Sequence, residues 1–336
     1  MMTKPSDKYE PKLYPEEQTR FALTPAMERI LMRDHLCFHE EIGTKIEGSD
    51  ITRILYGYLR YQRDKDVYAL EDTVTEAFDI PRKRGGGDYR FRFNRELTDL
   101  ICSFDFSREE NFNKRVLAET LLQSYCSLPY AEREKIFFYD SYLTIQACIS
   151  EHTMLDVRVR TVPGEIRSFS YKPCVMQTDD HSLLCYLAGY SRDIGTKSKY
   201  SIYSVRLQRI VSAINTKQSF SLNDTQQEKI RRRIEEFGIA YINWECGEQI
   251  RVALTEYGYQ MYLKILLHQR PLTSAPVETK EGSYPYILTF NCSQYQIMNY
   301  FFPFGAEAEI LEPLELREEF AEKFRNAVEV YKSEQT

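Results

Sequence analysis

Histidine, the side chain that most often carries acid–base or metal chemistry, is sparse in this 336-residue sequence. The five histidines are His35, His39, His152, His181 and His268. None of them stands in a Ser-His-Asp or HExxH arrangement. The glycine run at 85–87 lacks the Gly-Lys-Ser/Thr ending and the strand-to-helix setting of a phosphate-binding loop. We therefore predict that the protein is not an enzyme and needs no cofactor.

The histidines and cysteines also show few of the spacings that are typical of metal sites. His35 and His39 are four residues apart on a predicted helix, so both can face one metal ion. The sequence shows no third ligand for them, and a structural pair on a helix is the better interpretation. The eight cysteines include no CxxC spacing of the kind found in zinc ribbons. No metal site is predicted.

Compartment follows from two further observations. The first twenty residues contain no apolar run typical of a secretory signal, and no stretch of about 18 apolar residues occurs anywhere. The thiols are therefore interpreted as reduced core residues of a cytoplasmic protein with no membrane partner.

Basic residues gather in two places although the net charge is −6. Between Arg82 and Arg95 there are six basic residues and one acid. We predict that this segment contacts DNA. The residues predicted to do so are Arg82, Lys83, Arg84, Arg90 and Arg92. The alternative is a solvated hairpin whose arginines keep an edge strand soluble.

The second basic group surrounds Tyr186. Arginine beside an aromatic ring can clamp a phosphate while a base stacks on the ring. The predicted ligand-binding residues are Tyr186, Arg206, Arg209, Arg192, Arg160 and Arg167. Arg206 and Arg209 are three apart and point to opposite faces of a strand unless a bulge intervenes. The alternative places Tyr186 in the core with its hydroxyl satisfied and pairs Arg209 with a carboxylate.

The elements expected to position these residues define an α+β fold. Residues 1–22 read as a flexible arm. Helices are predicted from Pro25, from Asp50 and around 70–78, followed by a glycine-tipped hairpin whose second strand is YRFRFN. Three helices and a hairpin are the outline of a winged-helix DNA-binding domain, assigned to 23–100. Residues 101–145 read as a helical linker.

The second half of the chain changes character. Short strand-like segments between His152 and Ala213 indicate a small barrel or sheet rather than a βαβ unit. A charged helix in 214–247 reads as a linker, and strands mixed with helices fill residues 248–336 as an α/β module.

Three segments in this half resemble the WYL domain, assigned to 146–213. They are Pro173-Cys174-Val175-Met176, Cys185-Tyr186-Leu187-Ala188-Gly189-Tyr190 and Val205-Arg206-Leu207-Gln208-Arg209-Ile210. Their order and spacing follow the family, with Cys185 in place of its Trp and Tyr203 in place of a common Arg. The stretch from Phe304 to Pro313, with Leu316-Arg317 and a final helix, is similar to the C-terminal extension that follows WYL domains, the WCX-like part.

The resemblance implies a bacterial transcriptional regulator. It implies a small Sm-like or SH3-like β-barrel that senses single-stranded nucleic acid or a nucleotide-like ligand, a DNA-binding winged helix before it, and a homodimer. Two hypotheses follow. One is a ligand-responsive regulator that binds duplex DNA. The other is a phage-defence or CRISPR accessory protein that binds single-stranded RNA, single-stranded DNA or a nucleotide signal and modulates a protein partner.

Overall fold

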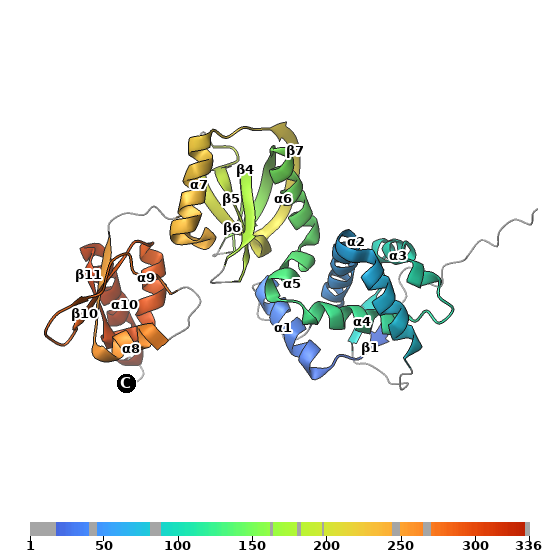
Figure 1. Ribbon diagram of the computed structural model, residues 1–336, viewed down its shortest axis with the longest axis horizontal. Helices are drawn as coiled ribbons and strands as arrows, with labels where there is room; N and C mark the ends of the chain where they lie inside the picture. The colour runs from blue at the N-terminus through green and yellow to red at the C-terminus, as the bar shows by residue number, and fades with distance from the viewer. Residues whose placement is uncertain are drawn as a thin grey trace, which may run out of the picture. The chain divides into compact units, whose positions relative to one another are not determined.

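The α+β class expected from the sequence is confirmed by a computed structural model of the chain (Figure 1). The residues that the structure describes are 18–39, 46–80, 89–161, 164–179, 183–196, 198–243, 249–264 and 270–332. The chain divides into two units, Met1–Thr144 and Ile145–Thr336.

The first unit is mostly helical. Its elements are β1 (Gln18–Phe21), α1 (Pro25–His39), α2 (Gly48–Asp79), β2 (Tyr89–Arg92), α3 (Arg95–Cys102), η1 (Asp105–Arg108), α4 (Lys114–Ser127) and α5 (Tyr130–Phe137). Helix α6 (Tyr139–Glu151) then leads into the second unit. The helices predicted from Asp50 and around 70–78 form one element, α2, with non-helical backbone at Asp66.

The strand predicted in YRFRFN is present as β2, but its partner is not the other arm of a glycine hairpin. It pairs antiparallel with β1, and Arg20 lies opposite Arg90. Residues 18–21 therefore belong to a two-stranded ribbon and not to the flexible arm. Four residues are too few to show a clear period, so the sequence did not reveal this strand. The predicted winged-helix outline is not found among the described residues, and 81–88, with the three glycines, lie outside them.

Most of the segment 101–145, predicted as a linker, instead completes the core of the first unit. Leu121 and Tyr125 of α4 and Phe137 of α5 are buried in one apolar cluster with Leu31 of α1 and Leu55 of α2. These helices are amphipathic, and burying their apolar faces against α1 and α2 removes those faces from water. They are therefore part of the domain rather than a connection between domains.

A five-stranded antiparallel sheet forms the centre of the second unit. Its strands are β3 (Thr153–Arg160), β4 (Ile166–Thr178), β5 (Cys185–Asp193), β6 (Ser201–Arg206) and β7 (Ile210–Ser219), in the order β6-β5-β4-β3-β7. The predicted barrel would need its edge strands β6 and β7 to pair. In the described part of the chain β6 and β7 do not pair. The chain passes from β6 through the three-residue turn η2 (Leu207–Arg209) into β7, which pairs with β3 at the other edge of the sheet.

Helix α7 (Asp224–Phe237) packs on one face of this sheet and is followed by η3 (Ile239–Tyr241). It begins with a capping box between Asn223 and Gln226, which satisfies backbone N–H groups of its first turn. Its Ile230 lies in a buried cluster with Tyr186 and Tyr190 of β5. The helix predicted as a linker in 214–247 therefore covers the sheet.

The last part of the chain has its own sheet and core. Its elements are β8 (Ile250–Leu254), α8 (Glu256–Lys264), β9 (Glu278–Thr279), β10 (Tyr286–Phe290), α9 (Gln294–Phe301), η4 (Phe302–Glu307), β11 (Ala308–Glu312) and α10 (Leu314–Lys332). The antiparallel strand order is β11-β8-β10-β9, and Phe301 of α9 and Phe320 of α10 share the buried cluster of this sheet. Within the described ranges, none of the helices combines the length and the apolar character needed to cross a bilayer.

Candidate nucleic-acid interface

The strand register sorts the predicted ligand-binding residues onto two faces of the central sheet. Directly opposite residues of an antiparallel pair point to the same face. Arg192 of β5 lies opposite Ser170 of β4, and Arg206 of β6 lies opposite Tyr186. By the two-residue period of β5, Tyr186 and Arg192 share one face. Arg158 and Arg160 of β3 lie on this face as well, because Arg158 pairs with Ser168.

Arg167 and Arg209 are directed to the opposite face. The Arg167 guanidinium lies 5.4 Å from the centre of the Phe169 ring, and its Nη2 is 2.7 Å from a carboxylate oxygen of Asp193. Burial raises the pKa of Tyr203, and the nearby charges of Arg167 and Arg209 oppose that shift. Arg206 ends β6, whereas Arg209 belongs to the turn η2 and its charge lies near Tyr203, so the strand-spacing argument does not apply to this pair and the six predicted residues do not form one site.

Tyr186 is part of the core. Only 5% of the residue is exposed, and it packs in the cluster formed with α7. Its hydroxyl accepts a hydrogen bond of 3.0 Å from Nε of Arg206, whose guanidinium lies 5.9 Å from the ring centre. The ring is therefore not open to a base in this arrangement. The prediction that Tyr186 stacks a ligand is replaced by the alternative, a core tyrosine with a satisfied hydroxyl.

A second aromatic residue, Tyr200, has the role that the sequence predicted for Tyr186, that of an aromatic ring beside basic side chains. The Arg192 guanidinium lies 4.8 Å and the Lys172 ammonium 5.2 Å from the centre of its ring. Lys172 and Arg192 are diagonal neighbours on β4 and β5, a spacing of about 7–8 Å that long side chains bridge. One ring thus holds two cations side by side.

We refer to Arg158, Arg160, Lys172, Arg192 and Tyr200 as the basic face. In the part of the chain that the structure describes, no carboxylate forms an ion pair with Arg158, Lys172 or Arg192. By register Asp156 lies on the same face as Arg192, two strands away or about 10 Å, while the adjacent Asp193 points to the other face and pairs with Arg167. Ser168 and Ser170 lie between these cations and add hydroxyl donors. Such a surface suits an extended polyanion.

The basic face and the Tyr186–Arg206 contact are separate places. Arg192 is six positions after Tyr186 in β5, which corresponds to about 20 Å along the strand. Sequence reasoning missed Lys172 and Tyr200. The two-residue period of a strand could have identified both of them. It places Tyr200 on the same side as Arg206, and Lys172 on the same side as Ser170.

A second group of arginines lies on the ribbon of β1 and β2. Arg20, Arg90 and Arg92 are exposed and share one face, since Arg20 lies opposite Arg90 and Gln18 opposite Arg92. The other face carries Phe21 and Phe91, which are buried with ring centres 5.5 Å apart. The core therefore fixes the direction in which the arginines point. Arg20 was missed because its strand was assigned to the arm, and Arg82, Lys83 and Arg84 lie outside the described residues.

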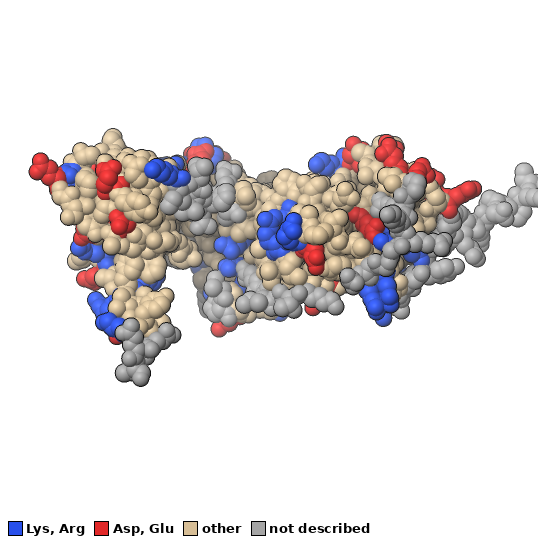
Figure 2. Space-filling model, turned by 90° about the horizontal axis from the view of Figure 1, so that it is seen from below, with Lys and Arg blue, Asp and Glu red and all other residues tan. Residues whose placement is uncertain are grey.

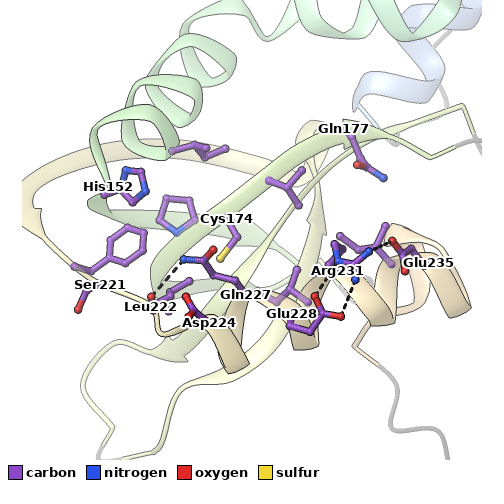
Figure 3. Close-up of a pocket in the computed structure, with 16 residues that line it drawn as sticks. His152, Cys174, Gln177, Ser221, Leu222, Asp224, Gln227, Glu228, Arg231 and Glu235 are labelled. Atoms are coloured by element: carbon purple, nitrogen blue, oxygen red, sulfur yellow. Dashed lines mark hydrogen bonds and ion pairs between the residues drawn. The ribbon is translucent and has the colours of Figure 1, made fainter.

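A groove of the second unit lies between β4 and α7 and has a volume of about 1050 Å³ (Figure 3). Much of its wall is apolar, with Pro173, Val175 and Ile234 among the lining residues. At its edge Arg231 is held between two acids. Its guanidinium lies 2.7 Å from Glu228 and 2.7 Å from Glu235 (Figure 3). Because the acids here exceed the cations, this groove does not suit a phosphate.

Figure 2 shows Lys and Arg in separate small groups, with acidic and uncharged residues among them. Of the seven described cysteines, Cys126, Cys148, Cys185 and Cys292 are buried, and Cys37, Cys102 and Cys174 are partly exposed.

Comparison with known proteins gives one matching domain and one shared fold. Residues 249–328 match the WCX domain, which confirms the predicted C-terminal extension, while the WYL domain itself stays a prediction. A solved structure described as a CRISPR Cas-related protein aligns over 98% of this chain and 97% of its own, with a TM-score of 0.71 and 19% identity. The two share a fold.

Proteasome accessory factor B/C (PafBC) of Arthrobacter aurescens aligns over 76% of this chain and 34% of its own, with 15% identity and a TM-score of 0.28. That score does not show a shared overall fold, and the aligned part spans about a third of that protein. No curated protein matches the chain.

Proposed function

We propose that this protein is a nucleic-acid-binding regulator of the WYL type, and that its basic face binds a single-stranded nucleic acid. The observation that carries the proposal is the pair Lys172 and Arg192, two cations on one tyrosine ring with no ion-paired carboxylate among the described residues. The WCX match supports the type of protein. The shared fold with a CRISPR Cas-related protein supports a defence context.

The chemistry of the basic face favours phosphates. Contact with the Tyr200 ring restricts Lys172 and Arg192 before a ligand arrives, so less side-chain entropy is lost on binding. Arginine can donate two parallel hydrogen bonds to one phosphate, and lysine acts as a point charge. Arg158, one strand further along the sheet, extends the positive surface past a single phosphate. The ligand is therefore expected to be a strand rather than a mononucleotide.

Duplex DNA is assigned to the ribbon. A two-stranded β-ribbon can enter the major groove, and arginine is the side chain that most often reads guanine there. Arg20, Arg90 and Arg92 project from one face of such a ribbon. In the regulator that we propose, the ligand on the basic face changes the affinity of the ribbon for an operator, and the active form is a homodimer.

The experiment measures fluorescence anisotropy of the full chain with labelled single strands and duplexes over a salt series. Each phosphate neutralised on a single strand contributes about −0.7 to the slope of log affinity against log salt, so Arg158, Lys172 and Arg192, the three cations without an ion pair among the described residues, give about −2 together. Single-strand affinity should then fall about 20-fold between 50 and 200 mM salt, against about threefold for the Lys172→Met/Arg192→Met variant. Arg231→Met is the matched control, because its guanidinium is already paired with two acids.

Arg90→Met/Arg92→Met is expected to abolish duplex binding and leave the single-strand slope unchanged. An unchanged slope in the Lys172→Met/Arg192→Met variant would refute the basic face. If single strands bind at the basic face but no duplex binds at all, the second hypothesis is correct. The protein is then a defence accessory that binds a single strand or nucleotide signal and acts on a protein partner.

A further inference from the structure

A cluster of three metal-ligating side chains lies at the junction of α1 and α2, outside both nucleic-acid surfaces. His35 and His39 stand one turn apart at the end of α1, with ring centres 4.9 Å apart. Asp50 faces them from the first turn of α2. Its two oxygens lie 2.6 Å from Nδ1 of His35 and 2.9 Å from Nε2 of His39. The third ligand that the sequence did not show is thus supplied by the next helix.

The cluster is largely shielded from water. The side chain of Asp50 is 5% exposed, that of His35 11% and that of His39 31%. The ring of Phe137 lies edge-on to His39 with the centres 5.6 Å apart, and the Arg53 guanidinium lies 4.9 Å from the centre of the same ring. A carboxylate taken out of water is costly unless it is paired or binds a metal ion. Both imidazoles face this one carboxylate, so the site offers two nitrogens, one oxygen and a single negative charge.

These ligand atoms are close enough to surround one ion. All three lie within 4.8 Å of one another. An ion bound tetrahedrally at 2.0–2.2 Å separates its ligand atoms by about 3.3 Å. The contact of His35 to Oδ2 would have to lengthen by about 0.7 Å and that of His39 to Oδ1 by about 0.4 Å, and the two nitrogens, which lie within 4.8 Å of each other, would have to reach the same separation. Small side-chain rotations provide such movements. The nitrogens and the carboxylate oxygen must then be deprotonated, with the metal replacing the shared hydrogens.

We propose that His35, His39 and Asp50 form a binding site for a divalent transition-metal ion, with zinc as the best match. Two histidines at i and i+4 on one helix plus one carboxylate are a ligand set that zinc uses with a fourth position left to water. Mg²⁺ and Ca²⁺ are disfavoured because they take oxygen ligands. Among the described residues this is the one cluster of three such side chains.

The expected role of the ion is to hold two helices together. It would tie the last turn of α1 to the first turn of α2. That first turn also supports the ribbon, because Thr52 donates a hydrogen bond of 3.1 Å to the carbonyl of Arg92. A Cβ placed on Gly48 would lie 3.0 Å from the carbonyl oxygen of Arg90, so helix and strand are in close contact there. Loss of the metal is therefore expected to lower the stability of the first unit, whether or not nucleic acid is bound.

The test is metal binding by the full chain after removal of bound ions with a chelator. Zinc is titrated in competition with a chromogenic chelator, and Co²⁺ is added separately to follow its visible absorption. We expect one high-affinity zinc ion per chain, a Co²⁺ spectrum typical of a four-coordinate N/O site, and a rise in melting temperature with zinc. Changing an outer partner of a metal ligand usually costs 10–100-fold in affinity, so His39→Gln and Asp50→Asn should each cost at least tenfold.

His152→Asn is the matched control. His152 is exposed, and asparagine tolerates its positive φ of 53°. That variant should bind zinc like the wild-type protein. Absence of tight zinc binding in the wild-type chain would overturn the site, as would unchanged affinity in His39→Gln. If Asp50→Asn does not fold, the zinc affinity of His39→Gln tests the site, because His39 is the most exposed of the three side chains and its substitution disturbs the core least. The single-strand salt slope is not expected to change, which separates this proposal from the proposed function.

Discussion

Breaking the buried ion pair between Asp34 and Arg133 is expected to destabilise the first unit more than any other single polar change that the structure suggests. Nε of Arg133 lies 2.7 Å from Oδ2 of Asp34 and Nη2 lies 3.0 Å from Oδ1, a bidentate contact. Tyr125 donates a third hydrogen bond of 3.1 Å to Oδ2. The side chains of Asp34 and Arg133 are 1% and 4% exposed.

The magnitude follows from what each substitution leaves behind. Burial alone would lower the pKa of Arg133, and the hydrogen bonds and charge of Asp34 raise it above its usual value. Asp34→Asn removes that charge and leaves the guanidinium buried without a counterion, for which the expected cost is about 3–5 kcal/mol. Tyr125→Phe removes one hydrogen bond to a charged acceptor, which costs about 1.5–3 kcal/mol.

Differential scanning calorimetry of the full chain provides the measurement. At roughly 3 °C per kcal/mol for a unit of this size, Asp34→Asn should lower the melting temperature of the first unit by about 10 °C. The transition of the second unit should not move. Asp140→Asn is the control, because Asp140 pairs with Arg60 but is 76% exposed, and such surface pairs contribute about 0–1 kcal/mol.

A double variant makes the reasoning refutable. Asp34→Leu/Arg133→Met removes both charges together, so no buried charge is left alone, and it should cost less than either single change. Equal or additive losses in the double variant would show that the pair is not the cause. A shift of less than about 2 °C for Asp34→Asn would mean that water reaches the site and the burial argument fails.

Two further predictions concern the central sheet. Tyr186 is buried and its hydroxyl contacts Arg206, so Tyr186→Phe should change single-strand affinity, measured by anisotropy, by no more than about twofold. The same variant should lower the free energy of unfolding by about 1 kcal/mol, measured by thermal unfolding. A loss of affinity comparable to that of Lys172→Met/Arg192→Met would show that Tyr186 belongs to the binding site. Burial raises the pKa of the Cys174 thiol to about 11, with opposition from the Tyr190 backbone and the Lys172 charge. Since only the thiolate reacts, labelling of Cys174 followed by peptide mass spectrometry should be slow at pH 8 and rise about tenfold per pH unit up to about pH 11, whereas a rate that levels off near pH 8.5 would contradict the shift.

Local pattern was sufficient for much of the fold. The alternation of Tyr89, Phe91 and Phe93 with polar residues identified β2, and the spacing of Ile51, Ile54 and Leu55 identified the buried side of α2. Both signals depend only on neighbours in the chain. The α+β class and the C-terminal extension followed from the same kind of evidence together with the resemblance of residues 304–317.

Pairings between distant residues were not predictable in this way. Arg20 joins Arg90 only because β1 pairs with a strand about 70 residues later, and Asp50 joins His35 only because α2 turns back on α1. Nothing in a four-residue strand or in a lone aspartate marks its partner. The ligand-contacting aromatic residue was predicted wrongly for the same reason. Tyr186 and Tyr200 look alike in the sequence, and only the packing of Ile230, Ile239 and Ile242 shows that Tyr186 is buried while Tyr200 stays partly exposed at the edge of the same cluster.

Partners, rather than residue type, distinguish the arginines of this chain. Arg133 is buried on a carboxylate, and Arg231 is held on the surface by two acids, so neither retains a charge for a ligand. Arg192 is held by an aromatic ring, which fixes its position and leaves its charge uncompensated. A net charge of −6 averages over these three situations. It therefore does not argue against a nucleic-acid ligand, because binding depends on the few cations that the fold immobilises without neutralising.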